Sequence, residues 1–499
     1  MNKNILSLSI GAILFSMSHS TCAADDTVPF FNEFHENPTQ VMNKIPVKRS
    51  NNGSELPAFF SNEEINENNF VKLKDKSRKD FINKNNKALN FDSFSLIDYN
   101  TDNPAHLVDL GFKLETNLIK LDSKATQESH LPRTAWSDTY WPLYSGASAW
   151  RYADNPSANN WQEYYDFSHT VKPAEQYIDD EKNNLSPAEK YDLLVGDKNM
   201  SLTSSAWDSG KSYFDSYGEV EGWMGLCHGW AAAAYMMDRP QKAITVKDAK
   251  GDDLMFYPSD IKALGTLLWA SSPYQSNFMG QRCNIKNPEK DENGRIIEQS
   301  CFDNNPGSFH TAILNQIGIS KRSLVMDATY DYQVWNQPIL SYKLKYVNLV
   351  SNTTKDTLED AIINIDAYKN DKFQSYRSDD ATQIVGVKME LEYLSETSPT
   401  HNKTDNEHRD HTVTVDYFYD LEIDKQGTII GGEWYSNAHP DFLWTPTKNA
   451  IAQSYPKVYG EWKEGQSIPE YWKKRAQSAS NNNQPLTKVV YELVKRSSQ

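Results

Sequence analysis

Residues 222–237 read GWMGLCHGWAAAAYMM. The four alanines and two methionines at the end of this stretch favour a helix, whereas the glycines and tryptophans before them do not. Cys227 therefore falls at or next to a helix start, where the helix dipole and unpaired N–H groups stabilise a thiolate and lower a thiol pKa. Because a thiolate is a nucleophile, the stretch predicts covalent catalysis. The alternative is a small buried cysteine in a core helix.

The other cysteines strengthen the first interpretation. Residues 1–24 combine a basic start, an apolar stretch and a small-residue exit, which predicts a cleavable secretory signal and a secreted or periplasmic protein. Cleavage there removes Cys22. Cys283 and Cys301 bracket a polar loop, the usual setting of a local disulfide. Cys227 is then the odd thiol in an oxidising compartment, which indicates a reactive residue.

Charge and composition exclude several function classes. The formal net charge of −16 argues against nucleic acids and anionic membranes as partners. Beyond the signal, no segment approaches the ~20 continuous apolar residues that a membrane span needs. We therefore expect no nucleic-acid partner and no membrane partner, and the oligomeric state stays open.

Composition also divides the chain. Residues 25–130 are mostly polar, with only short apolar patches, and are interpreted as a propeptide-like segment. Residues 131–475 are rich in aromatic side chains and are interpreted as the catalytic body, with residues 476–499 as a C-terminal tail. We expect the 25–130 segment to dock on the body and suppress activity until a protease cuts near residues 124–133. A solvated spacer is the alternative.

The order of the predicted elements gives the fold class. Helices are expected at the Cys227 stretch and over residues 259–270. Apolar residues then alternate over 385–393 and 413–423, as in strands, and a hairpin turn follows at 424–427. Helices followed by an antiparallel sheet predict an α+β fold.

A cysteine nucleophile in acyl transfer needs a base and a group that orients the base. His310 begins an apolar segment, and Asp327 ends the next predicted strand, with residues 317–322 as the turn between two strands. Neighbouring strands would carry the imidazole and the carboxylate side by side. The order Cys227, His310, Asp327 is that of papain-like enzymes.

Other histidines are weaker candidates for the base. The side chain of His228 would point about 100° around the helix from that of Cys227. His439 lies in a loop that is expected to shape the groove. His408 and His411 lack the further spaced ligands of a zinc site, and no stretch matches a calcium loop. The sequence therefore predicts no metal site.

Two motifs carry a family resemblance. The pentapeptide Val334-Trp335-Asn336-Gln337-Pro338 resembles the surface peptide of the oomycete transglutaminase elicitor family. The Cys-His-Gly-Trp motif at 227–230 is similar to the context of that family's nucleophile. The resemblance runs from about Trp136 to Trp472, but Leu340-Ser341 stands where the elicitor peptide has Arg-Gly.

The resemblance implies a papain-like cysteine acyltransferase body, with N-terminal helices and a C-terminal antiparallel sheet. It implies Cys227 as nucleophile, His310 as base and Asp327 as orienting group. It also implies calcium dependence, for which no site is found in the sequence; no other cofactor is expected.

These observations lead to one functional hypothesis. The chain is expected to be a secreted protein-glutamine γ-glutamyltransferase that joins a glutamine donor protein to a lysine or polyamine through a thioester. The N–H of Cys227 would bind the oxyanion, with Trp223 as a wall of the site. The alternatives are a papain-like thiol protease, a glutamine deamidase, or a non-catalytic elicitor recognised through residues 334–346.

Overall fold

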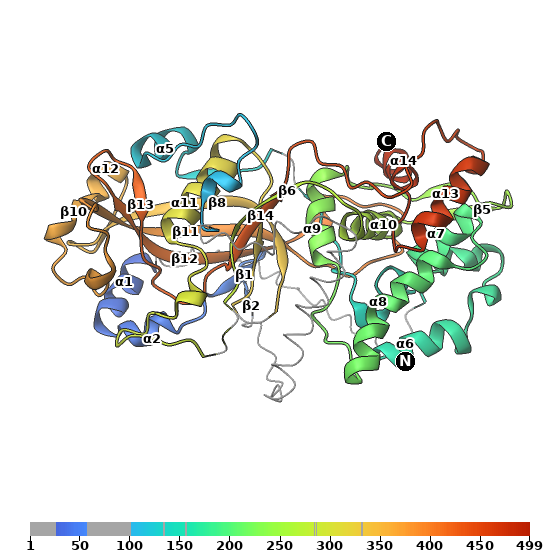
Figure 1. Ribbon diagram of the computed structural model, residues 1–499, viewed down its shortest axis with the longest axis horizontal. Coiled ribbons are helices and arrows are strands. Elements are labelled where there is room, and N and C mark those ends of the chain that lie inside the picture. Colours follow the sequence, from blue (N-terminus) through green and yellow to red (C-terminus); the bar gives the residue numbers. More distant parts are fainter. Residues whose placement is uncertain are drawn as a thin grey trace, which may run out of the picture.

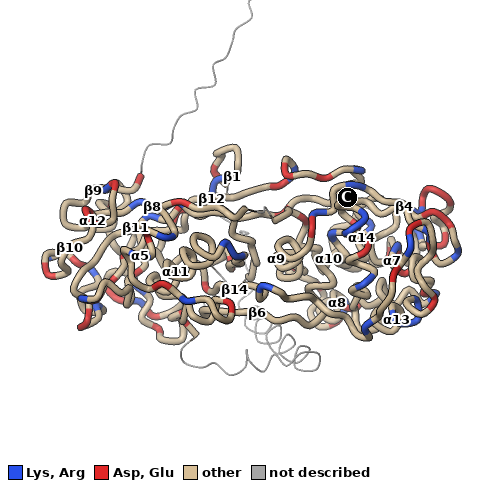
Figure 2. Tube along the Cα trace, turned by 90° about the horizontal axis from the view of Figure 1, so that it is seen from above, with Lys and Arg blue, Asp and Glu red and all other residues tan. Residues whose placement is uncertain are grey.

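The computed structural model describes residues 26–56, 101–132, 135–154, 157–283, 285, 287–330 and 333–499. One half of the elongated molecule is built around a sheet and the other half is mostly helical (Figure 1). The predicted signal, residues 1–24, lies outside the described residues. In the described part of the chain, each helix is too short or too polar to cross a bilayer. Acidic and basic positions are interspersed over both halves (Figure 2).

The sheet is organised by three long antiparallel strands, β8 (Asn336–Asn348), β11 (Gln383–Ser395) and β12 (His411–Ile423). The order through the sheet is β2-β1-β12-β11-β8-β7-β14-β6. The shorter strands of this sheet are β1 (Lys48–Ser50), β2 (Glu55–Leu56), β3 (Glu128–His130), β6 (Ser276–Gly280), β7 (Val325–Asp327), β9 (Thr353–Lys355), β10 (Ile363–Asn364), β13 (Ile429–Gly431) and β14 (Phe442–Pro446).

Both faces of the long strands are buried, because successive side chains point to opposite faces. Tyr417 and Tyr419 of β12 join one apolar cluster, whereas Phe418 between them joins another. Helices α5 (Leu118–Ala125) and α11 (Pro306–Ile313) cover the first face, and α1 (Thr27–Glu36) covers the second. The strands expected from the alternation at 385–393 and 413–423 are confirmed, but the pattern did not reveal that the opposite face is also covered.

The helical half has its own apolar core and contains the helix predicted at Cys227. Its elements are α6 (Trp161–Asp166), α7 (Pro187–Val195), α8 (Ser201–Tyr217), α9 (Cys227–Met236), α10 (Pro258–Ser271), α13 (Glu470–Ser480) and α14 (Thr487–Ser498), with the two-stranded sheet β4 (Ile244–Lys247) and β5 (Asp253–Phe256). The helix expected over residues 259–270 is α10. An α+β fold is confirmed.

The last residues are part of this core. Val489, Val490 and Leu493 of α14 are fully buried, and α14 packs against α10. Position 476, where we placed the start of a tail, falls inside α13. The sequence suggested a linker there because residues 478–484 are polar, but the apolar face of the next helix returns the chain to the core.

The described parts of the 25–130 segment also pack on the body. Phe31 and Phe34 of α1 are fully buried, in a cluster with Phe373 and Tyr435. The chain continues through α2 (Pro38–Met42) to β1, which pairs with β12. Residues 26–56 therefore pack on the body, because a few apolar side chains at helical spacing are sufficient to anchor them. Removal of the segment by a protease stays a prediction.

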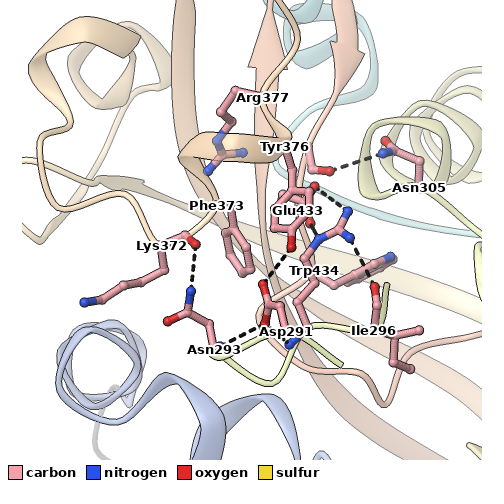
Figure 3. Close-up of polar contacts among 12 residues, drawn as sticks. Asp291, Asn293, Ile296, Asn305, Lys372, Phe373, Tyr376, Arg377, Glu433 and Trp434 are labelled. Atoms are coloured by element: carbon pink, nitrogen blue, oxygen red, sulfur yellow. Dashed lines mark hydrogen bonds and ion pairs between the residues drawn. The ribbon is translucent and has the colours of Figure 1, made fainter. Parts of the chain in front are cut away.

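The structure contains the expected disulfide between Cys283 and Cys301, and Cys227 is the free cysteine of the described residues. Arg295, within the disulfide-closed loop, makes a bidentate ion pair with Glu433 at 2.6 and 2.9 Å (Figure 3). Its guanidinium also lies 4.0 Å from the ring centroid of Tyr376.

Two further contacts hold this loop. The hydroxyl of Tyr376 donates to Asp291 at 3.0 Å, and the amide of Asn293 donates to the carbonyl of Lys372 at 3.1 Å (Figure 3). The loop is thus tied to the segment at 372–376 as well as to Glu433, which follows β13.

A further short helix of the sheet half is α12 (Leu358–Ala361).

Replacing both bridge cysteines by serine, C283S/C301S, is expected to lower the free energy of unfolding by about 3 kcal/mol. This is the loop-closure entropy of a bridge of this span, since the unfolded chain regains freedom. Denaturant unfolding measures the change, and wild-type protein unfolded under reducing conditions is the matched control. A change below about 0.5 kcal/mol in both would mean that the polar contacts alone hold the loop.

Candidate active site

Cys227 is the first residue of α9, which packs between α10 and β8 (Figure 1). The two nearby glycines permit this placement. A Cβ on Gly229 would collide with the carbonyl of Thr266 in α10, and one on Gly225 would lie 2.5 Å from the carbonyl of Tyr140. The glycines that flank the cysteine therefore let the helix start approach its neighbours closely.

The thiol of Cys227 faces the beginning of β8. It donates to the carbonyl of Val334 at 3.7 Å and accepts from the amide of Asn336 at 3.4 Å. Burial raises its pKa to about 11; the Asn336 hydrogen bonds oppose this shift, whereas the charges of Glu396 and Asp327 add to it. Burial thus acts against the low thiol pKa expected at a helix start.

Asp327 and Asn336 are direct cross-strand neighbours at the ends of β7 and β8. The Asp327 carboxylate accepts from the N–H of Trp335 at 3.0 Å and from the hydroxyl of Thr329 at 2.9 Å. Burial raises its pKa to about 6, against the charge of Arg282 and these hydrogen bonds. The side chains of Asp327 and Asn336, at adjacent strand ends, thus lie next to the Cys227 thiol.

The orientation of Asn336 is fixed from its other side. Its Oδ1 accepts from the indole N–H of Trp444 in β14 at 2.8 Å, so its NH₂ group is the part that faces Cys227. The sequence singled out Asn336 only as part of a surface peptide. Residues 335–338 are buried, so this part of the pentapeptide belongs to the interior and to the site.

A second layer surrounds these groups. The half-buried Glu396 accepts with its carboxylate from the amide of Gln337 at 2.6 Å, and desolvation raises the pKa of Glu396. The ring of Tyr140 lies 4.9 Å from that of Trp335, and its carbonyl accepts from the N–H of Leu226 at 2.6 Å. Neither Glu396 nor Tyr140 stands in a motif that points to a site, so no sequence pattern could have predicted their place in it.

Asn336→Leu is expected to lower the rate of the reaction at Cys227 about 10- to 100-fold, because removing a hydrogen bond to a charged group costs roughly 1.5–3 kcal/mol. It should also move the pH dependence of Cys227 alkylation by iodoacetamide to higher pH, since Asn336 lowers the thiol pKa. The control is Asn348→Leu, at the other end of β8. An unchanged alkylation profile would contradict a role for Asn336 in stabilising the thiolate.

The structure does not place His310 in hydrogen-bond contact with the Cys227 thiol. His310 lies in helix α11, which Asn305 caps and Pro306 begins, and not at the start of a strand. The predicted turn at 317–322 is also wrong, because a π-helical turn over Leu314–Ile319 extends α11. Burial lowers the pKa of His310 to about 3.

His310 makes its side-chain contact with β12. Its Nδ1 lies 2.8 Å from the hydroxyl of Tyr419. The Tyr419 ring lies 5.9 Å from the His310 ring and 5.2 Å from the ring of Trp434, on which His439 stacks. His310 therefore borders the same aromatic cluster as His439, but its imidazole is held by Tyr419.

His439 lies at the correct end of the sheet. It precedes β14, whose Leu443 aligns with Met326 in β7, so the residues before β14 lie beside those that follow β7. Its ring stacks on Trp434 at 4.6 Å, and its Nδ1 is 3.5 Å from a carboxylate oxygen of Asp303. Burial lowers its pKa to about 4, so the imidazole is neutral near pH 7.

The remaining candidates have other surroundings. Burial lowers the pKa of His228, against a hydrogen bond with the backbone of Ala270. His408 is exposed and His411 begins β12. The indole N–H of Trp223 donates to Glu221, and its role as a wall of the site stays a prediction.

Metal binding gains no support from the described residues. Among them, no three His, Cys, Asp or Glu side chains are grouped in a way that could hold a metal ion. Calcium dependence stays an expectation from the resemblance, and no step below uses a metal ion.

The geometry defines a class of site, a cysteine at a helix N-terminus that faces polar side chains at strand ends. The model of the family described as "Transglutaminase elicitor" matches residues 108–461, more than half of the chain. The chain belongs to the transglutaminase elicitor family. The match begins inside the segment that we separated from the body at position 131.

One solved structure is similar to this chain, that of the GP42 transglutaminase from Phytophthora sojae. It is 20% identical in sequence, the alignment covers 74% of this chain and 95% of that chain, and the TM-score is 0.46. No curated protein matches the chain.

Proposed function

We propose that this protein is a protein-glutamine γ-glutamyltransferase with a papain-like catalytic arrangement, in which Cys227 is the nucleophile. The observation that carries the proposal is the start of α9 against the strand ends of β7 and β8, with the thiol 3.4 Å from the Asn336 amide. Family membership supports the general kind of protein. The disulfide is consistent with an extracellular location.

In the first half of the reaction, the Cys227 sulfur attacks the γ-carboxamide carbon of a substrate glutamine. The N–H at the start of α9 binds the developing oxyanion, with Trp223 as a wall of the site. The C–N bond then breaks, and the leaving nitrogen takes a proton and departs as ammonia. The product is a thioester on Cys227.

In the second half, a primary amine of a lysine or polyamine attacks the thioester carbon. The C–S bond breaks, the amine loses a proton, and the thiol is regenerated with an isopeptide bond in the product. Each half therefore needs one group that accepts and returns a proton.

We assign that proton transfer to His439. Its imidazole is neutral and lies at the sheet end that carries Asp327, with Asp303 beside its Nδ1. His310, the choice from the sequence, would have to leave its hydrogen-bond partner Tyr419 to act as the base. The charge of Asp327 contributes to the raised pKa of the Cys227 thiol. Its carboxylate also accepts from the N–H of Trp335 and so holds the residue that precedes β8.

The proposal is tested with a glutamine-containing peptide and dansylcadaverine, with fluorescence incorporation and ammonia release followed together. Both products are expected at equal rates. Ammonia without amine incorporation would mean glutamine hydrolysis instead of transfer. If folded protein whose Cys227 still reacts with iodoacetamide gives neither product, the enzyme assignment is wrong.

A further inference from the structure

The N-terminal strand β1 places a lysine beside the candidate active site. Lys48 aligns with Val415 of β12, and its side chain is almost fully buried. Its Nζ donates to the carbonyl of Ala328 at 2.6 Å. Ala328 follows Asp327 directly, so Lys48 holds the chain where it leaves the strand that carries this carboxylate.

The surroundings of the Lys48 ammonium are those that a buried cation requires. Its Nζ lies 5.2 Å from the ring centroid of Tyr330 and 6.0 Å from that of Tyr393. Its charge lowers the pKa of Glu396. A buried ammonium is costly without such partners, so a carbonyl, two aromatic faces and a carboxylate together form a specific site for it.

This lysine is linked to both strand ends at Cys227. On one side it binds Ala328, whose own N–H donates to the carbonyl of Trp335 at 3.0 Å. On the other side its charge acts on Glu396, which accepts from Gln337, the neighbour of Asn336.

From these contacts we infer that Lys48 is a positioning residue for the reaction at Cys227, and that β1 is a working part of the active site. The inference rests on the proposed function for its meaning in catalysis. This positioning role is the opposite of the inhibitory role predicted for the N-terminal segment. Loss of the Lys48 contacts should slow turnover, whereas loss of an inhibitory contact should increase turnover.

The same strand offers a matched control. Arg49 is the next residue, and its side chain pairs with Asp416 at 2.8 Å and with Glu390 at 3.6 Å. Successive side chains of a strand point to opposite faces, so Arg49→Met removes one positive charge from β1 without altering the Lys48 site. Lys48→Met keeps the length of the apolar stem and removes only the ammonium.

We expect Lys48→Met to lower kcat for amine incorporation at least tenfold with little change in the KM of the amine, and Lys48→Arg to restore at least a third of the rate. Arg49→Met should stay within threefold of wild type. Lys48→Met should also speed alkylation of Cys227 by iodoacetamide about fivefold, because Ala328, whose N–H binds the carbonyl of Trp335 next to Val334, is no longer held. Melting temperatures identify a variant that is merely unfolded.

Turnover by Lys48→Met equal to or above wild type would overturn the inference, as would an equal loss in Arg49→Met or no rescue by arginine. The alkylation rates test the Lys48 contacts even if the chain transfers no acyl group, so failure of the proposed function is distinguishable. Where Lys48→Met does not fold, Tyr330→Leu replaces it. This change removes the ring beside the ammonium and leaves the pairing of β1 with β12 intact.

Discussion

Cys227→Ser is expected to lower amine incorporation and ammonia release at least 10³-fold while the protein remains folded. Serine is nearly isosteric with cysteine, and its hydroxyl can accept the hydrogen bond that Asn336 donates to the thiol. A buried hydroxyl is far less acidic than a thiol, so the nucleophile is lost although its position is kept.

Steady-state rates and thermal unfolding measure these two effects on the same preparations. The C283S/C301S protein, which keeps Cys227, is the matched control for loss of cysteine, and it should retain turnover under conditions where it is folded. Activity of Cys227→Ser within roughly tenfold of wild type would remove Cys227 from the mechanism.

His439→Gln is expected to lower the rate at least 100-fold, since general acid–base catalysis typically contributes 10²–10⁴-fold. His310→Gln should change the rate less than threefold, because glutamine can keep a hydrogen bond to Tyr419 and the proposed mechanism gives His310 no proton to transfer. His310 is fully buried and the His439 side chain is 11% exposed, so each variant serves as a stability control for the other.

The comparison is made by kcat with saturating amine, beside melting temperatures of the two variants. An inactive His310→Gln protein together with an active His439→Gln protein would reverse the assignment. That result would mean that the histidine chosen from the sequence reaches the thiol in a conformation different from this one.

Local patterns predicted the elements that local interactions determine. The alanine run after Cys227 marks the start of α9, and the alternation at 413–423 marks β12, because helix propensity and strand periodicity are properties of the segment itself. The pairing of Cys283 with Cys301 followed from the number of cysteines left after the signal and from the polar loop between these two. His310 was misplaced because an apolar run of this length fits a strand or a helix equally, and the Asn305 cap decides for the helix.

The rest of the site depends on register between distant segments. Trp444 reaches Asn336 because β14, β7 and β8 are adjacent, and Lys48 reaches Ala328 across 280 positions of the sequence. No pattern within either segment carries this information. The raised pKa of Cys227 has the same origin, since it comes from burial and from carboxyl groups that other strands supply.

The proposed reaction passes through a thioester at Cys227, which mass spectrometry detects directly. Wild-type protein is incubated with a glutamine-containing donor peptide without amine, quenched in acid and analysed intact and after digestion. We predict an adduct with the mass of the donor minus ammonia, located on the peptide that contains Cys227 and released by hydroxylamine. Amine incorporation that proceeds with no such adduct, or with the adduct on another residue, would contradict the account.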